Sequence, residues 1–378
     1  MTMLIDLALA ALLLACLIAV AWPFAVYPAI LRVFPHKALK NSDKRTLTAS
    51  LLFCAYNEAQ AMPDKIANLE MLKERHPELE IWAFDDGSAD GTGDMLAAHG
   101  GLINLIRGGG RSGKAHGMKL LAAQAKGDVL IFTDANVTLA PEAVDRLLSY
   151  YADPDVGGVL GSLHYLGASG SATASGGSLY WRIEEALKDL ESRSGNVMGA
   201  DGSIFSIRRA LYPEFPDDVL DDMTVSMAVV FAGKRLIKAK DVIAYEGLVA
   251  SRGDEYRRKI RIAARSWHTH RHLRPKLRKM NALDRFKYAS RKIVRWFGAA
   301  FITLGALAAL GLAWRLSPWV AGALVLGLMV FLVAGTMLRK GPVAAIMDML
   351  IAYFATLQGV VKAMRGRTVT TWAPAKSR

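Results

Sequence analysis

The chain begins with an apolar run that is long enough to cross a lipid bilayer. From Met3 to Leu31 the sequence MLIDLALAALLLACLIAVAWPFAVYPAIL carries a single charge, Asp6. A membrane-spanning helix needs about 20 apolar residues, and this run lacks the basic start and short apolar core of a cleaved signal peptide. We therefore predict an uncleaved transmembrane anchor.

Basic residues follow the anchor directly and predict its orientation. Positive residues beside a spanning helix are retained on the cytoplasmic side. We therefore expect a multi-pass protein of the cell (inner) membrane whose next domain is cytoplasmic. The two cysteines, Cys16 in the anchor and Cys54 in that domain, exclude a disulfide framework. The basic residues are Arg32, His36, Lys37, Lys40, Lys44 and Arg45.

Three further apolar runs lie near the C-terminus. Phe297–Ala313 and Trp319–Leu338 flank the short sequence WRLSP and predict a transmembrane hairpin. The third run, Pro342–Val361, contains Asp348 and Gln358, so we predict a helix that lies in the membrane interface.

A basic segment precedes the hairpin. Between Arg252 and Arg295 there are 16 Lys or Arg residues and three acids. The net charge of this segment, +13, equals that of the whole chain. Basic patches can bind the phosphates of nucleic acid, but this one ends at a membrane helix, where anionic lipid headgroups attract it. We predict helices at the membrane surface, with membrane lipids and no nucleic acid as partners. The predicted units are the anchor (1–34), a cytoplasmic domain (46–250), basic interfacial helices (251–296), the hairpin (297–340), and an interfacial helix with a cytoplasmic tail (341–378).

The cytoplasmic domain alternates strand-like and helix-like segments. ASLLFCAYN, LEIWAFDDGS, GLINLIR and DVLIFTDAN read as strands, with amphipathic segments between them. The alternation predicts an α/β fold, a mostly parallel sheet with helices on both faces. Such sheets bind ligands at the carboxyl ends of their strands. The polar loops AYNEA, DDGSADGT, GGGRSGK and TDAN follow these strands, so they predict one nucleotide-sized site.

One of these loops matches the phosphate-binding loop of ATPases. Gly108 to Lys114 reads GxxxxGK, but an ATPase loop follows the first strand and has Ser or Thr after GK. Here Ala115 fills that place, and the loop follows the third strand. Glycine-rich backbone amides with Lys114 at a helix start still favour a diphosphate. A non-catalytic or P-loop-like nucleotide-binding membrane component remains an alternative.

Two motifs carry a family resemblance. The chain has YNE at Tyr56–Glu58 and a complete DDGSxDxT at Asp85–Thr92. From about Leu51 to Trp267 it resembles glycosyltransferase family 2, and within it the membrane branch of cellulose, chitin and hyaluronan synthases. The resemblance implies the nucleotide-diphospho-sugar transferase type A fold and a nucleotide-sugar donor, expected to be UDP-linked. It also implies that four side chains surround the uracil and ribose: Tyr56, Glu58, Asp85 and Asp86.

The sequence TDAN resembles the family's metal-binding DxD motif. It implies that Asp134 and Asn136 bind a divalent metal, Mg or Mn, which bridges the protein and the diphosphate. Asn136 departs from the second Asp of the motif, although its amide oxygen can also ligate. An Asx turn that ends the strand is the alternative for Asn136.

An acidic pair, Asp221-Asp222, resembles the family's catalytic motif at the start of a helix. The resemblance implies that Asp222 is the general base that takes the proton of the acceptor hydroxyl, with Asp221 beside it. The alternative is that acids at a helix start complement the helix dipole. The preceding GADG, Gly199 to Gly202, resembles the family's acceptor-side loop.

The sequence RIAARSW is similar to the QxxRW motif of processive members. It implies that Arg265 contacts the diphosphate and that Trp267 stacks beneath the acceptor sugar. The motif lacks its Gln and has one residue inserted before the Trp, which weakens the prediction of processivity and leaves a membrane-interface role open for Trp267. His268, His270 and His272 alternate as metal ligands can, but we interpret them as solvated.

The order of the elements resembles that of cellulose synthase, and this resemblance implies that the C-terminal sequence TVTTW is the Thr-rich gating loop. We predict that Thr370, Thr371 and Trp372 close over the bound nucleotide sugar from a cytoplasmic C-terminus. The alternative is a disordered basic tail.

Together these features predict a membrane-anchored inverting glycosyltransferase that builds a polysaccharide or a glycolipid on the cytoplasmic face. Its partners would be a nucleotide sugar and a saccharide or lipid-linked acceptor. Three predicted spans are few for an export channel, so an export or polymerisation partner protein is also expected. The alternative enzyme, a polyprenyl-phosphate sugar synthase, would need neither the Asp221-Asp222 pair nor the Arg/Trp segment.

Overall fold

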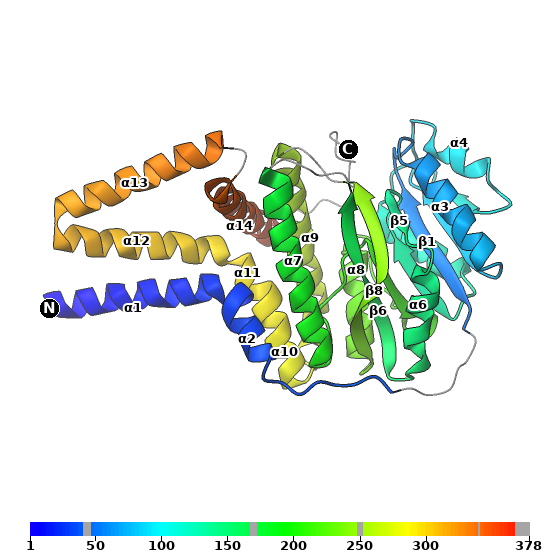
Figure 1. Ribbon diagram of the computed structural model, residues 1–378, viewed down its shortest axis with the longest axis horizontal. Coiled ribbons are helices and arrows are strands. Elements are labelled where there is room, and N and C mark those ends of the chain that lie inside the picture. Colours follow the sequence, from blue (N-terminus) through cyan, green and yellow to red (C-terminus); the bar gives the residue numbers. More distant parts are fainter. Residues whose placement is uncertain (41–46, 167–171, 248–251, 339–340, 367–378) are drawn as a thin grey trace.

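The computed structural model describes residues 1–40, 47–166, 172–247, 252–338 and 341–366. The molecule is elongated, with a helical arm at one end and an α/β domain at the other (Figure 1).

One eight-stranded sheet forms the centre of the α/β domain. Its strands are β1 (Ala49–Ala55), β2 (Glu80–Asp85), β3 (Asn104–Arg107), β4 (Val129–Thr133), β5 (Val137–Leu139), β6 (Val156–Leu166), β7 (Ile204–Arg208) and β8 (Arg235–Gly247). They lie in the order β3-β2-β1-β4-β7-β6-β8-β5. β1 to β4 are mutually parallel, β6 and β8 are parallel, and β7 and β5 run antiparallel to their neighbours. The predicted mostly parallel sheet is confirmed.

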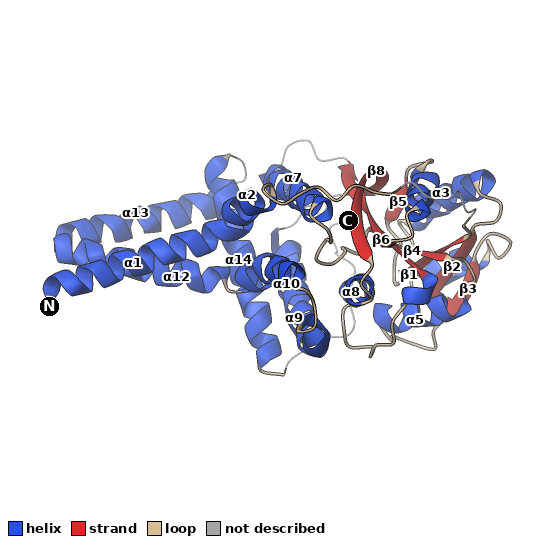
Figure 2. Cartoon of the chain, turned by 90° about the horizontal axis from the view of Figure 1, so that it is seen from below, coloured by secondary structure: helices blue, strands red, loops and turns tan. Residues whose placement is uncertain are grey.

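Helices cover both faces of the sheet, as predicted. α3 lies on one side and α5 and α8 on the other (Figure 2). β1 is buried on both faces: Leu51 and Phe53 join the core with α3, and Leu52 and Cys54 join the core with α5 and α8. This double burial explains the continuous apolar sequence of β1. The helices are α3 (Met62–Arg75), α4 (Thr92–Ala97), α5 (Lys114–Gln124), α6 (Ala143–Ser149), η2 (Tyr150–Ala152), α7 (Ala172–Arg193), η3 (Arg209–Leu211) and α8 (Asp221–Phe231).

The arm contains helices that are apolar enough to cross a membrane. Within the described residues, four helical segments are long and apolar enough to do so: Thr2–Leu31, Gly298–Leu316, Pro318–Met337 and Pro342–Met364. α1 packs along α12, and Asp6, the single charge of the first run, forms an ion pair with Arg315 at the end of α12. The helices are α1 (Thr2–Ala21), the π-helical turn η1 (Trp22–Val26), α2 (Tyr27–Leu31), α12 (Gly298–Leu316), α13 (Pro318–Met337) and α14 (Pro342–Met364).

The basic segment forms helices between the arm and the sheet. They are α9 (Arg252–Leu277), α10 (Ala282–Tyr288), the π-helical turn η4 (Ala289–Ile293) and α11 (Val294–Trp296). α14 packs along α9 so closely that a Cβ built on Gly359 would lie 2.3 Å from the carbonyl oxygen of Ile260. Figure 1 shows α14 at an angle to α1, α12 and α13. The helix over the third apolar run forms as predicted, and its position in the membrane interface stays a prediction.

Candidate active site

Charged side chains from three elements converge beyond the carboxyl end of β4. The Nζ atom of Lys114, the first residue of α5, lies 2.5 Å from Oδ1 of Asp134 and 4.0 Å from Oδ2 of Asp221. Although burial acts to lower it, Asp134 and Asp221 raise the pKa of Lys114 well above its ordinary value. A Cβ built on Gly202 would lie 3.0 Å from this Nζ and 3.5 Å from Oδ2 of Asp134. The structure thus brings together residues that are far apart in the sequence.

The glycine-rich loop before α5 is shaped by Asp86, which is fully buried. Its carboxylate accepts hydrogen bonds from the backbone N–H of Ser112 (2.7 Å), the Ser112 hydroxyl (2.9 Å) and the backbone N–H of Gly113 (3.0 Å). It also accepts one from Nε of Arg111 (3.3 Å). Asp86 therefore holds the loop that presents Lys114 to the site.

The YNE segment, Tyr56–Glu58, is hydrogen-bonded to the loop that follows β2. The guanidinium of Arg111 lies 3.4 Å from the centre of the Tyr56 ring. The backbone N–H of Glu58 donates to the Thr92 hydroxyl at 2.9 Å. Asp85 is buried and accepts from the backbone N–H of Ser88 at 3.1 Å. These contacts bring Tyr56, Glu58 and Asp85 to the same edge of the sheet as Asp86.

The Asp134–Asn136 turn offers oxygen ligands to a metal. Asp134 keeps 35% of its side chain exposed, and Nδ2 of Asn136 donates to Oε1 of Glu246 at 2.9 Å, which orients the amide. No group of three His, Cys, Asp or Glu residues is placed to hold a metal within the described residues. A hard cation such as Mg²⁺ is often held by one or two protein oxygens together with substrate phosphates. The residues present fit that arrangement.

The acidic pair opens α8. Asp221 is buried and Asp222 is half-buried. Burial and the neighbouring carboxylate of Asp221 raise the pKa of Asp222 to about 6, against the opposing charge of Lys114. Asp222 therefore titrates in a range where its ionised form predominates at neutral pH.

The loop from Gly199 to Gly202 runs beside α8. Gly199 has a φ of 97°, which favours glycine. The backbone N–H of Ala200 donates to the Ser226 hydroxyl of α8 at 2.9 Å. Asp201 forms an ion pair with Lys188 of α7. Through these contacts the loop is held against both α7 and α8, with Gly202 beside Lys114 and Asp134.

The structure places the Arg/Trp segment on α9. Nη2 of Arg265 donates to the carbonyl of Val219, just before the acidic pair, at 2.8 Å. Trp267 packs edge-on against Trp296 and Phe297, with ring centres 5.4 and 5.9 Å away. In this conformation Arg265 holds the backbone just before the acidic pair, and Trp267 lies in an aromatic cluster at the start of α12.

The histidines of α9 and the C-terminal Thr/Trp residues complete the set of predicted residues. The alternating histidines are solvated only in part: His272 is exposed, whereas His268 and His270 are half-buried. Nε2 of His268 lies 2.9 Å from Asp218, and Nδ1 of His270 lies 3.1 Å from the Tyr288 hydroxyl. The gating residues Thr370, Thr371 and Trp372 lie outside the described residues.

Sequence reasoning missed Lys65 of α3, which is fully buried. Its Nζ donates to the carbonyls of Asp134 (3.1 Å) and Val137 (2.7 Å) and so fixes the backbone of the turn that carries Asp134. Its position among the apolar residues of MPDKIANLEML was the available signal.

A protein family and several solved structures are similar to this chain. Residues 50–215 match the family described as Glycosyl transferase family 2. Mannosyltransferase PcManGT from Pyrobaculum calidifontis, solved in complex with GDP-Man and Mn2+, is similar with 21% identity and a TM-score of 0.75, covering 95% of this chain and 99% of its own. S. aureus TarS 1-349, solved in complex with UDP-GlcNAc, has 14% identity and a TM-score of 0.45, covering 85% of this chain and 93% of its own. No curated protein matches the chain. The PcManGT match shows that the fold, including the helical arm, recurs in another protein.

Proposed function

We propose that this chain transfers a sugar, with inversion, from a nucleotide sugar to an acceptor at the cytoplasmic face of a membrane. Residues 50–215 match the family described as Glycosyl transferase family 2, so the chain is a glycosyltransferase. The product is a polysaccharide or a glycolipid. The observation that carries the proposal is the convergence of Lys114, Asp134 and Asp221 beside Gly202.

On the donor side, the cationic Nζ of Lys114 and the amides of the glycine loop bind the diphosphate. Tyr56, Glu58, Asp85 and Asp86 surround the base and ribose, and Arg265 adds positive charge when the donor is bound. Asp134 and Asn136 would hold a divalent metal, which offsets the charge on the departing nucleoside diphosphate. PcManGT was solved with Mn2+, which supports such a metal in this fold.

On the acceptor side, Asp222 takes the proton. The acceptor hydroxyl oxygen forms a bond to the anomeric carbon of the donor sugar from the face opposite the diphosphate. The bond between that carbon and the diphosphate oxygen breaks, and the nucleoside diphosphate leaves with the bonding electrons. Asp221 keeps Lys114 in place and its charge holds Asp222 at a useful basicity. The Gly199–Gly202 loop and Trp267 bind the acceptor.

The choice of nucleotide and acceptor rests on the family resemblance and on the acidic pair. The family resemblance favours a UDP-sugar, whereas PcManGT was solved with GDP-Man, so both nucleotides belong in any screen. A polyprenyl-phosphate acceptor is the second candidate, but the Asp221-Asp222 pair favours an acceptor that has a proton to lose. If the product is a polymer, a partner protein would export or extend it.

The rate of transfer should depend on the ionisation of Asp222. Its pKa is raised to about 6, and only its carboxylate form can accept a proton. We therefore expect kcat/KM to fall about tenfold per pH unit below this pKa. Asp221→Asn removes the negative neighbour and should shift this acid limb to lower pH. A pH–rate profile measures both, and an unshifted limb in the variant would argue against the pair.

The tail prediction concerns residues 367–378. Five basic residues after the third apolar run oppose export of the C-terminus, so a C-terminal reporter that is active only outside the cytoplasm should stay silent. Deletion of the residues after Arg367 should cut activity without releasing the protein from membranes, because Thr370, Thr371 and Trp372 close over the donor. A bright reporter contradicts the topology, and full activity contradicts the gating role. The basic residues are Lys362, Arg365, Arg367, Lys376 and Arg378.

A binding experiment separates the proposal from the P-loop-like alternative. Purified full-length protein should bind UDP or GDP more tightly with Mn²⁺ than without it, and should not bind ATP preferentially. Isothermal titration calorimetry measures each affinity. Preferential binding of ATP would support the alternative.

A further inference from the structure

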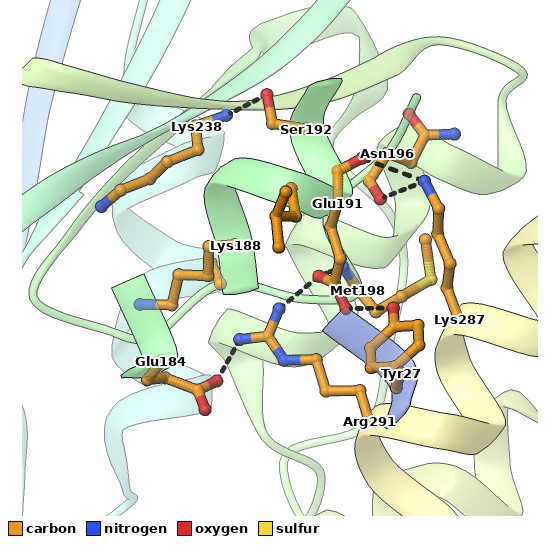
Figure 3. A network of polar contacts seen from close by, with 12 residues as sticks. Tyr27, Glu184, Lys188, Glu191, Ser192, Asn196, Met198, Lys238, Lys287 and Arg291 are labelled. Carbon is orange, nitrogen blue, oxygen red and sulfur yellow. Dashed lines mark hydrogen bonds and ion pairs between the residues drawn. The ribbon is translucent and has the colours of Figure 1, made fainter. Parts of the chain in front are cut away.

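A buried carboxylate links the N-terminal anchor to the loop that contains Gly199 and Gly202. Glu191, near the end of α7, is fully buried and accepts three hydrogen bonds (Figure 3). Its Oε1 accepts from the Tyr27 hydroxyl at 2.7 Å. Its Oε2 accepts from Nη1 of Arg291 at 2.5 Å and from the backbone N–H of Met198 at 3.1 Å. Three separate segments of the chain therefore meet at one side chain.

Two of these segments belong to the membrane side of the molecule. Tyr27 begins α2, is fully buried, and packs edge-on against Phe286 with ring centres 5.8 Å apart. Arg291 lies in the π-helical turn η4, which contacts the π-helical turn η1 just before Tyr27. π-helical turns occur frequently at functional sites. The two irregular turns meet where the anchor docks on the α/β domain.

The third segment is the loop itself. Met198 is buried and directly precedes Gly199. The carbonyl of Asn196, also in this loop, accepts a hydrogen bond from Nζ of Lys287 at 3.3 Å, and the same Nζ donates to the Glu191 carbonyl at 2.9 Å. Glu191 therefore fixes the start of the loop, in the same way that Ser226 fixes its middle.

The Tyr27 hydroxyl supplies Glu191 with a hydrogen bond that Arg291 does not make. Arg291 is shared between Glu191 and Glu184, and its Nη2 lies 2.5 Å from Oε1 of Glu184. Although burial acts to lower it, these two acids raise the pKa of Arg291 above its ordinary value. Arg291 thus reaches only Oε2 of Glu191, and the Tyr27 hydroxyl supplies the hydrogen bond to Oε1. A buried carboxylate oxygen that loses its donor is costly, so Glu191 would turn away from Met198.

We propose that Tyr27 is a positioning residue for acceptor transfer: by orienting Glu191, the docked anchor fixes the backbone of residues 198–202. The proposal rests on the proposed function, because that loop is assigned to the acceptor. Donor binding depends on Lys114, Asp134 and Asp86, which belong to other elements. Loss of the Tyr27 hydroxyl therefore impairs transfer to the acceptor and spares donor binding.

Hydrogen exchange of the full-length protein in detergent tests the structural step. In Tyr27→Phe, the backbone amides of residues 196–203 should exchange roughly tenfold faster, the factor expected when one hydrogen bond to a charged group is lost. Tyr151→Phe is the matched control, because it removes another buried tyrosine hydroxyl, which lies 2.8 Å from Oγ of Ser206. The control should exchange as the wild type does in this segment. Equal rates in Tyr27→Phe and wild type, or the same increase in both variants, would overturn the proposal.

A ratio of rates tests the functional step. Radiolabelled UDP-glucose, UDP-N-acetylglucosamine and GDP-mannose are supplied to native membranes, and transfer into lipid and polymer is compared with hydrolysis of the same donor by the purified protein. The transfer-to-hydrolysis ratio should fall roughly tenfold in Tyr27→Phe and stay unchanged in Tyr151→Phe. An unchanged ratio, or a parallel loss of Mn²⁺-dependent UDP and GDP binding, would refute the positioning role. A wild-type protein that uses none of these donors counts against the proposed function, and the exchange rates then decide on Tyr27 by themselves.

Discussion

Asp222→Asn is expected to lower sugar transfer by roughly 10² to 10⁴-fold, the usual contribution of a general base, while leaving nucleotide affinity nearly unchanged. The amide keeps the shape of the side chain but cannot accept the proton of the acceptor hydroxyl. The residues proposed to bind the nucleotide and metal, Lys114 and Asp134, keep their ion pair in this variant. Transfer into native membranes gives the rate, and calorimetry with UDP and GDP gives the affinity.

Asp217→Asn is the matched control for this experiment. Asp217 lies four residues before α8, is half-exposed, and pairs with His116 at 3.0 Å and with Lys119. Exposed pairs of this kind contribute little, so the control should keep most of its activity. An Asp222→Asn protein that retains most of its transfer activity would show that Asp222 is not the base.

Asp134→Ala should abolish both activity and the metal dependence of nucleotide binding. Asp134 is the carboxylate of the turn assigned to the metal, and its loss also leaves Lys114 without its nearest partner. Even changes to the neighbours of metal ligands cost 10–100-fold in affinity, so we expect a loss of at least about 100-fold in half-saturation by Mn²⁺. Titration of Mn²⁺ into the protein with UDP or GDP measures this directly.

Asn136→Asp supplies the comparison in the same turn. It restores the second acid of the DxD motif, so metal binding should be retained or tightened. Normal Mn²⁺-dependent nucleotide binding by Asp134→Ala would remove Asp134 from the metal site.

The sequence was sufficient for the first half of the sheet, because its signals are local. The double-sided burial of Leu51 to Cys54 follows from one apolar run, and the glycine loop before Lys114 follows from its composition. The antiparallel direction of β7 and β5 does not follow from local signals of this kind. Their partners, such as Phe132 for Phe205, are distant in the sequence, and a short strand pattern does not specify its direction.

The residues that shape the site were harder to predict, since their partners come from remote segments. Glu191 and Lys65 look like ordinary charged residues of amphipathic helices, yet both are buried. Glu191 binds the side chains of Tyr27 and Arg291, and Lys65 binds the backbone of Asp134, all far away in the sequence. The segment around His268 reads as solvated because it is basic, and its partner Asp218, 50 residues away, gives no signal there. Only the three-dimensional fold shows that these pairs exist.

The central claim is that this chain is an inverting, nucleotide-sugar-dependent transferase, and a donor screen tests it most directly. Purified full-length protein with Mn²⁺ or Mg²⁺ is incubated with UDP-, GDP- and TDP-sugars, and the release of nucleoside diphosphate is measured with the anomeric configuration of the sugar product. We expect metal-dependent consumption of one donor class and a product of inverted configuration. Hydrolysis of ATP with no nucleotide sugar consumed, or a product that retains the donor's configuration, would contradict it.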